Sequence, residues 1–233
     1  MPLIEVDGVS HVYGAGAAAR TVLADVTVSL AEQRVGVIGA NGSGKSTFVR
    51  LLNGLVLPSS GRVRVDGLDT RSQGREVRTK VGFCFTDPDA QIVMPTVAED
   101  VAFGLRRRGL PKQEVAARVT SVLASYGLDG HADHPAHLLS GGQKQLLALA
   151  SVMVTEPAVL VMDEPTTLLD LRNAARIAEV VAGLPEQVVL VTHHLDLLEV
   201  FERVLVFDEG RLVCDDSPAA AVAHYRALMA ATP

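Results

Sequence analysis

Short runs of consecutive apolar residues recur along this chain, with stretches of more mixed composition between them. Such runs are typical of parallel strands that are covered on both faces and therefore show no polar side to water. They are residues 34–39 (RVGVIG), 81–85 (VGFCF), 158–163 (AVLVMD), 188–192 (VVLVT) and 203–207 (RVLVF). The pattern predicts a parallel sheet at the centre of the fold.

The stretches between these runs have helical periodicity, in which apolar residues return on one face of a helix. Helices are predicted at residues 45–53, 113–126, 142–154 and 171–181, and Gly127 follows the second of them as a stop signal. Residues 3–9 and 22–30 instead alternate apolar and polar side chains, which predicts an antiparallel side sheet. Strands that alternate with helices indicate an α/β layer architecture.

The composition fits one large globular domain over residues 1–233 with a substantial buried core. The chain is 48% hydrophobic and 21% charged, and its formal net charge is −6. Because neither half is rich in Lys and Arg, nucleic acid is disfavoured as a partner, and the basic run 106–108 is expected to be a solvated face. Cys84 and Cys214 lie in strand-like apolar runs and are expected to be reduced core thiols.

The N-terminal stretch MPLIEVDG has acidic residues where a signal peptide would carry a basic and then an apolar stretch. No apolar run approaches the roughly 18 residues that a membrane span needs. We therefore expect a soluble, cytosolic protein. If the protein serves a membrane, it is expected to do so from outside the bilayer.

The sharpest chemical motif is GANGSGKST at residues 39–47, which fits G-x-x-x-x-G-K-[ST] directly after a predicted strand and before a predicted helix. Its glycines let backbone N–H groups surround a phosphate, Lys45 supplies a positive charge to the β- and γ-phosphates, and Ser46 offers a hydroxyl to Mg²⁺. The chain is therefore expected to bind a nucleoside triphosphate with Mg²⁺. The residues predicted to bind it here are Gly39, Asn41, Gly42, Ser43, Gly44, Lys45, Ser46 and Thr47.

Two carboxylates stand at the end of the predicted strand 158–163. Asp163 is suited to contact Mg²⁺, and Glu164 would point to the place where water attacks the γ-phosphate. A strand that simply ends in solvated acids is the plainer interpretation, but a phosphate-binding loop already requires a metal partner. We therefore predict Asp163 as a metal contact and Glu164 as a catalytic residue.

The stretch LLSGGQKQLLAL at residues 138–149 places two glycines directly in front of a helical run. Ser140 is suited to cap that helix, and a helix start with free backbone N–H groups is a surface that receives an anion. Within it, LSGGQ resembles the signature sequence of ATP-binding-cassette (ABC) ATPases, and almost the whole chain supports the resemblance. The resemblance implies a P-loop NTPase with a RecA-like parallel core, an antiparallel side sheet, and a helical subdomain at roughly 87–155 that carries LSGGQ.

The same resemblance assigns further residues. It implies that Tyr13 stacks on the adenine of ATP, that DEPTTLLD ends at Asp170 of the D-loop, and that His193 is the switch histidine at the γ-phosphate. It also implies a homodimer, or a pair with a like ATPase, that encloses two ATP molecules between its protomers. In that arrangement the catalytic Lys45 of one protomer faces the signature of the other, whose ATP-binding residues are Ser140, Gly141, Gly142 and Gln143.

One position departs from the family pattern. Family members usually carry Gln just after the strand at 81–85, near Mg²⁺ and the attacking water, whereas this chain has Thr86 there and its nearest Gln is Gln91. Three alternatives stay open: Thr86 takes a weaker form of the role, Gln91 reaches in, or neither does. Thr86 is kept as a candidate catalytic residue.

Residues 87–104, DPDAQIVMPTVAEDVAFG, are similar to a stretch of energy-coupling-factor transporter ATPases, which import vitamins and transition-metal ions. This resemblance implies an ATPase bound peripherally at the cytoplasmic face of the cell membrane, with a transmembrane coupling protein and a substrate-binding membrane protein as partners. Residues 34–56, 89–97 and 163–173 look most like biotin-importer ATPases, so biotin is the expected solute. A cobalt or nickel importer is the alternative, followed by a non-transport ABC ATPase.

His131, His134 and His137 are spaced by three residues and could be imagined as a metal site for a cobalt or nickel importer. Pro135 disfavours the regular helix that would align them. The family also uses this stretch as the approach to LSGGQ. Ordinary structural roles are therefore the favoured interpretation of the three histidines.

Rival classes of protein fit the sequence less well. A DNA-repair or chromosome-condensing ATPase would carry a long coiled coil between Lys45 and Ser140, where this chain has no such repeat. A translation-associated cassette protein usually holds two cassettes in one chain, and nucleotide kinases and GTPases lack LSGGQ.

Overall fold

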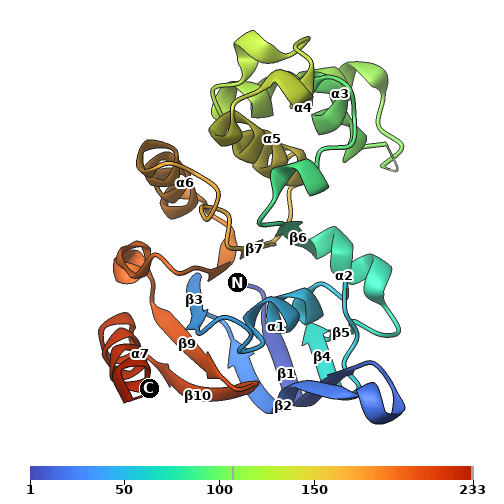
Figure 1. The fold of residues 1–233 in the computed structure, drawn as a ribbon. Coiled ribbons are helices and arrows are strands. Elements are labelled where there is room, and N and C mark those ends of the chain that lie inside the picture. The colour runs from blue at the N-terminus through green and yellow to red at the C-terminus, as the bar shows by residue number, and fades with distance from the viewer. Residues whose placement is uncertain (107, 232–233) are drawn as a thin grey trace.

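The computed structural model describes residues 1–106 and 108–231 and has a six-stranded sheet at its centre (Figure 1). The strand order is β10-β9-β3-β8-β7-β6, in which β10 pairs antiparallel with β9 and all other pairs are parallel. The predicted parallel sheet is confirmed, and the ends of the five predicted strands lie within one residue of the observed ends, whereas β10 was not among the predicted strands. The strands are β3 (Arg34–Gly39), β6 (Val81–Cys84), β7 (Val159–Asp163), β8 (Gln187–Val191), β9 (Arg203–Asp208) and β10 (Arg211–Asp216).

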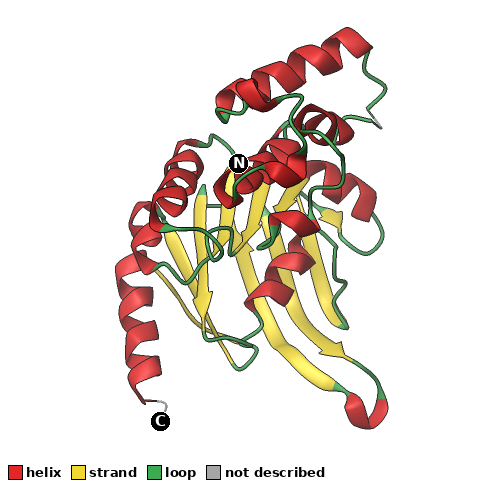
Figure 2. Cartoon of the chain, turned by 45° about the horizontal axis from the view of Figure 1, so that its top comes forward, coloured by secondary structure: helices red, strands yellow, loops and turns green. Residues whose placement is uncertain are grey.

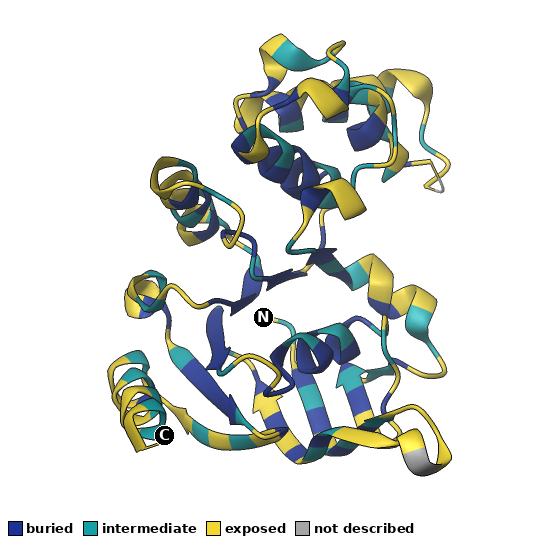
Figure 3. Cartoon of the chain, in the orientation of Figure 1, coloured by how far each residue is buried: buried dark blue, intermediate teal, exposed yellow. Residues whose placement is uncertain are grey.

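Alternate residues of the central strands enter two separate hydrophobic cores, one on each face of the sheet. Val37 and Val161 pack with α1 (Lys45–Leu52) and the side sheet, whereas Ile38 and Met162 pack on the opposite face with α5 (Gly141–Met153) and α6 (Leu171–Gly183). Every residue of β3, β7 and β8 is buried (Figure 3). This burial on both faces explains why these strands are apolar without alternation.

The antiparallel side sheet has the strand order β2-β1-β4-β5. The strands expected at 3–9 and 22–30 are confirmed, although both are longer, and the sequence pattern gave no prediction for β4 and β5. Figure 2 shows the strands of both sheets together, with helices around them. The register of the first two strands sets Tyr13 opposite Arg20. The strands are β1 (Ile4–Tyr13), β2 (Arg20–Leu30), β4 (Ser60–Val65) and β5 (Leu68–Asp69).

The four predicted helices form as α1, α4 (Lys112–Ser125), α5 and α6, with ends that differ from the predicted ones by at most two residues. Three further helices were not predicted from periodicity: α2 (Gly74–Lys80), α3 (Val97–Phe103) and α7 (Pro218–Ala231). α2 and α3 have seven residues each, which is too short for a clear apolar stripe. α7 is rich in Ala, and Ala221 is its buried residue.

The helical elements between residues 87 and 155 form a group of their own, at the top of Figure 1, beyond the ends of β6 and β7. Within it, α3, α4 and α5 pack on one another around Leu105, Leu123 and Leu146. The group also contains η2 (Pro88–Ala90), η3 (Asp129–His131) and η4 (Ala136–Leu138). Helices thus occupy the expected range, while the boundaries of a subdomain stay a prediction.

In the part of the chain that the structure describes, no helix is both long enough and apolar enough to cross a membrane.

Candidate functional site

The loop between β3 and α1 carries the phosphate-binding motif, and its backbone conformation requires glycine. Gly44 has a φ of 101°, which residues with side chains rarely adopt, and a Cβ there would lie 2.7 Å from the carbonyl oxygen of Val22. Since α1 begins at Lys45, directly after Gly44, the first N–H groups of that helix have no helical partners. The loop can therefore present backbone donors to an anion.

The side chain of Lys45 is held over this loop by the loop's own carbonyl groups. The residue is 4% exposed, and its Nζ donates to the carbonyl oxygens of Gly39 and Ala40, each at 2.9 Å. Because an ammonium group has three donors, one remains available for a phosphate. Burial lowers the pKa of Lys45, and the nearby carboxylates of Glu164 and Asp163 oppose that shift.

Asp163 ends β7 beside the loop and is 1% exposed. Its Oδ1 accepts from Ser46 Oγ at 2.8 Å, its Oδ2 accepts from Arg50 Nη2 at 3.1 Å, and its carbonyl oxygen accepts from Thr86 Oγ1 at 2.6 Å. Burial raises the pKa of the carboxyl group, and the hydrogen bond from Ser46 and the charge of Arg50 oppose that shift. Hydroxyl and carboxylate oxygens suit Mg²⁺, so the donor set of Ser46 and Asp163 fits this ion.

Glu164 follows with a backbone φ of 53°, in the left-handed region that non-glycine residues rarely occupy. Its N–H donates to the carbonyl oxygen of Val191 at 3.0 Å, its Oε1 lies 2.8 Å from His193 Nε2, and its Oε2 accepts from Thr167 Oγ1 at 3.0 Å. Such backbone strain costs about 1–3 kcal/mol and persists where the surrounding structure enforces it, often at functional sites. The strand ends of β7 and β8 thus bring a carboxylate and an imidazole together.

The phosphate-binding loop opens onto a cavity of about 360 Å³. Tyr13 is 44% exposed at this cavity, and its ring packs edge-on against His11 with the ring centroids 4.5 Å apart. An exposed aromatic ring beside a phosphate-binding loop can stack on a nucleobase. The cavity is lined by Tyr13, Arg20, Val22, Asn41, Gly42, Gly44, Lys45, Ser46, Thr47 and Glu164.

The lining of this cavity differs from the predicted set in two ways. Gly39 and Ser43 belong to the motif but do not line the cavity; Ser43 is 3% exposed, and a Cβ at Gly39 would collide with the backbone of β9. Arg20 and Val22 do line it, although no sequence motif contains either residue. The signal that could have identified Arg20 is its place opposite Tyr13 in the side sheet, which depends on strand register.

The four signature residues lie at the start of α5 and are not part of the cavity lining. Ser140 Oγ accepts from the N–H of Gln143 at 3.4 Å, and Gln143 Oε1 accepts from the N–H of Ser140 at 2.9 Å, so the two residues form a capping box. Gly142 packs so closely on Asn173 of α6 that a Cβ would collide with that side chain. Ser140 and Gly141 are exposed, which leaves the start of this helix open to a second molecule.

Thr86 and Gln91, the two candidates for the role of the family's Gln, have different hydrogen-bond partners. Thr86 donates to the backbone of Asp163, as described above, and so lies beside the predicted metal contact. Both ends of the Gln91 amide are engaged elsewhere: Oε1 accepts from the N–H of Phe85 at 3.1 Å, and Nε2 donates to the carbonyl oxygen of Ala148 at 2.9 Å. Gln91 therefore joins the end of β6 to the middle of α5, a contact that no sequence pattern indicated.

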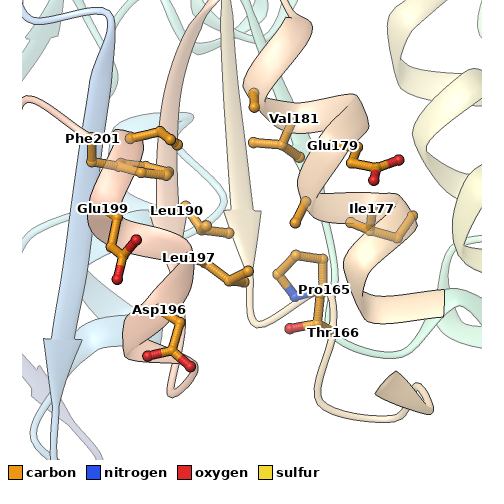
Figure 4. Close-up of a pocket in the computed structure, with 13 residues that line it drawn as sticks. Pro165, Thr166, Ile177, Glu179, Val181, Leu190, Asp196, Leu197, Glu199 and Phe201 are labelled. Atoms are coloured by element: carbon orange, nitrogen blue, oxygen red, sulfur yellow. The ribbon is translucent and has the colours of Figure 1, made fainter. Parts of the chain in front are cut away.

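A second cavity, of about 230 Å³, lies between α6 and η5 (Leu195–Val200) (Figure 4). Pro165 and Leu197 line it, so it borders the segments that follow Glu164 and His193 in the sequence. Its charged lining residues are all acidic and would repel a phosphate. This cavity is therefore distinct in chemistry from the one at Lys45; its acidic residues are Glu179, Asp196 and Glu199.

Comparison with known proteins gives consistent matches over most of the chain. The ABC transporter family matches residues 23–167. The biotin transport ATP-binding protein BioM of Rhizobium etli is 51% identical, with 93% of this chain and 96% of that protein covered.

Two solved structures have the same fold. CbiO1 from Clostridium perfringens, part of the ABC transporter complex cbiONQ, has a TM-score of 0.83 and is 32% identical over 97% of this chain and 93% of that one. The ATP-binding cassette MJ0796, solved as a dimer in a post-hydrolysis state bound to ADP and Pi, has a TM-score of 0.81 and is 26% identical over 92% of this chain and 98% of that one. A P-loop NTPase core with an antiparallel side sheet is therefore confirmed.

We expect Glu164→Gln to slow ATP hydrolysis by about 10²–10⁴-fold while ATP still binds, because the amide keeps the shape of the side chain but cannot accept a proton. Phosphate release and retention of radiolabelled ATP on gel filtration measure the two effects separately. The matched control is Glu199→Gln, a carboxylate at the second cavity, which should hydrolyse ATP as the unaltered chain does. Hydrolysis at the unaltered rate in Glu164→Gln would remove Glu164 from the catalytic role.

We expect Thr86→Ala to reduce ATP hydrolysis by less than about tenfold, since it removes one hydrogen bond to the Asp163 backbone and a net hydrogen bond is worth about 0.5–1.5 kcal/mol. Thr86→Ser keeps the hydroxyl and should restore the rate. His193→Ala, which removes the partner of Glu164, should cost more activity than Thr86→Ala. A collapse of kcat in Thr86→Ala with nucleotide still bound would instead show that Thr86 acts directly on the reaction.

Proposed function

This chain belongs to the ATP-binding subunits of ABC transporters, and on that basis we propose that it energises an importer of the energy-coupling-factor type whose solute is biotin. The family makes it an ATPase whose hydrolysis is coupled to transport. The observation that supports the ATPase part of the proposal is the convergence of Lys45, Ser46 and Glu164 on one cavity beside Asp163. In this arrangement Lys45 would contact the triphosphate, Ser46 and Asp163 the metal ion, and Glu164 the attacking water.

The roles of the residues follow from their contacts. Lys45 has one free donor for the β- and γ-phosphates, and the N–H groups at the start of α1 surround the phosphate chain. Ser46 and Asp163 would hold Mg²⁺, which neutralises charge on the phosphates when bound. Asp163 must then exchange part of its present bonding, since its two carboxylate oxygens accept from Ser46 and Arg50.

Glu164 is proposed to orient the attacking water and to accept its proton. Its carboxylate lies between Thr167, which donates a hydrogen bond to Oε2, and His193, whose Nε2 is 2.8 Å from Oε1, so both oxygens have a partner that orients them. His193 can in turn sense the γ-phosphate and keep Glu164 in place. Positioned proton acceptors of this kind contribute typically about 10²–10⁴-fold to a rate.

A second copy of the chain is proposed to complete each site. The signature residues do not line the cavity of their own chain, and Leu168 and Leu171 beside Asp170 are 64% and 85% exposed. Exposed leucines at and just before the start of α6, together with an exposed start of α5 that is suited to receive an anion, fit a contact between protomers. A helix start gains only about 0.3–1 kcal/mol from a nearby anion, so ATP would bias the dimer toward closure and hydrolysis would release it.

The membrane partners are proposed to contact the segment between the end of β6 and the end of α3. Val93 is 61% exposed and Phe103 is 45% exposed there, on the segment that resembles the docking region of energy-coupling-factor ATPases. Gln91 lies in the same segment and donates a hydrogen bond to α5, so a displacement of this segment by a membrane partner would be transmitted to the helix that carries the signature. We therefore place the protein at the cytoplasmic face of the membrane, on a transmembrane coupling protein that works with a substrate-binding membrane protein.

Biotin is proposed because the BioM protein of Rhizobium etli is similar over nearly the full length of both chains. The solute itself never touches an ATPase of this kind, so the residues of the nucleotide site cannot distinguish one solute from another. Importers of cobalt or nickel ions are the alternative within the same group.

Mixing two inactive variants tests the composite site. Lys45→Ala damages the phosphate side and Ser140→Arg damages the signature side, so a mixed dimer should hold one doubly damaged site and one intact site. We expect about a quarter of the unaltered ATPase activity when both are mixed in equal amounts, because half of the dimers are mixed and half of the sites in each are intact. Mixed dimers shown by mass spectrometry without any ATPase activity would contradict two independent composite sites.

Measuring solute uptake by cells tests which solute the transporter imports. Cells that express this chain with its membrane partners should accumulate radiolabelled biotin, and cells in which the chain carries Glu164→Gln should not, since hydrolysis is the energy source. Cobalt and nickel uptake are measured in the same cells. Metal uptake that depends on Glu164, with no effect on biotin, would overturn the biotin assignment and leave the ATPase assignment intact.

A further inference from the structure

The signature motif is held in place by a histidine from outside it. Gln143 Oε1 accepts from the N–H of Ser140 at 2.9 Å, and this bond fixes which end of the amide is which. The other end, Nε2, then points to His131 Nε2 at 3.0 Å. His131 closes η3, ahead of the signature in the sequence, so the contact links that turn to the start of α5.

The direction of this hydrogen bond determines the state of the histidine. An amide NH₂ group can only donate, so His131 Nε2 must carry a lone pair and accept. The proton of the neutral ring then lies on Nδ1, a buried atom without a hydrogen-bond partner in the described part of the chain. A protonated ring would present an N–H to the amide NH₂, and the two donors would face each other.

The ring of His131 packs against a second histidine. The ring of His134 lies edge-on with its centroid 4.9 Å away, and among the described residues no carboxylate is within ion-pair distance of His131. Asp129 and Asp133 are the acids of the same turn, and Lys112 of α4 lines a cleft with Asp129.

The remaining charged groups on the neighbouring helices are paired elsewhere. On α5, Lys144 pairs with Asp89, and on α4, Glu114 pairs with Arg118. The group on α5 that contacts His131 is therefore the uncharged amide of Gln143.

We propose that neutral His131 is a positioning residue for the signature. By accepting from Gln143 it holds the amide that bonds to the Ser140 N–H, and so it sets Ser140 and the first N–H groups of α5 for the γ-phosphate bound by the partner protomer. The inference rests on the composite dimer proposed above. Its consequence is that ATP-driven dimer closure requires a hydrogen-bond acceptor at position 131.

The test uses the full chain with Glu164→Gln, so that ATP hydrolysis is slowed, and measures the dimer dissociation constant with ATP. Adding His131→Leu, which removes the acceptor, should weaken the dimer at least fivefold. Adding His131→Gln instead, whose Oε1 can accept from Gln143, should keep dimer affinity near that of the parent. His134→Gln should leave dimer affinity unchanged.

Binding of a fluorescent ATP analogue to the monomer separates positioning from misfolding, because the cavity at Lys45 lies in the other half of the chain and should bind equally in all four proteins. A dimer in His131→Leu as tight as that of its parent, or a dimer in His131→Gln as weak as that in His131→Leu, would overturn the role of His131. Absence of any ATP-dependent dimer in the parent would overturn the composite dimer itself and this inference with it.

Discussion

The buried carboxylate of Asp163 joins the end of β7 to α1, the helix that follows the phosphate-binding loop. A charge that is 1% exposed must be compensated, and Ser46 and Arg50 of α1 do so on its two oxygens. Thr86 of the segment after β6 bonds to its backbone. The side chain and backbone of this one residue therefore join α1 to the ends of β6 and β7, and Glu164 is positioned as the next residue in the chain.

The same strand ends lead to the other half of the molecule. Phe85 follows β6, and its N–H donates to Gln91, whose amide also donates to α5 at Ala148. Hydrogen bonds of Thr86 and Gln91 thus lie along the segment between Asp163 and the helix that carries the signature. Gln91 stands five positions after the residue at which the family usually has its Gln.

The central strands and the phosphate-binding loop could be predicted from the sequence, because burial and backbone geometry restrict which residues can occupy these positions. Strands buried on both faces are continuous apolar runs, so their positions could be predicted from the sequence. The glycines together with Lys45 identified the phosphate-binding loop after β3. Contacts that depend on register or on helix packing could not be predicted: Arg20 lines the cavity through its pairing with Tyr13, and His131 reaches Gln143 across a turn. Ordinary structural roles were the favoured interpretation of the histidine cluster, but the contact of His131 with Gln143 of the signature was not predicted.

The central claim is that each ATP is enclosed between the loop of one protomer and the signature of another. The most direct measurement is a crystal structure of the Glu164→Gln protein with ATP and Mg²⁺. The account predicts a dimer in which Ser140 and the start of α5 of one protomer contact the γ-phosphate held by Lys45 of the other. A structure in which ATP is bound at Lys45 but contacts no second protomer, or contacts the signature of its own chain, would contradict it.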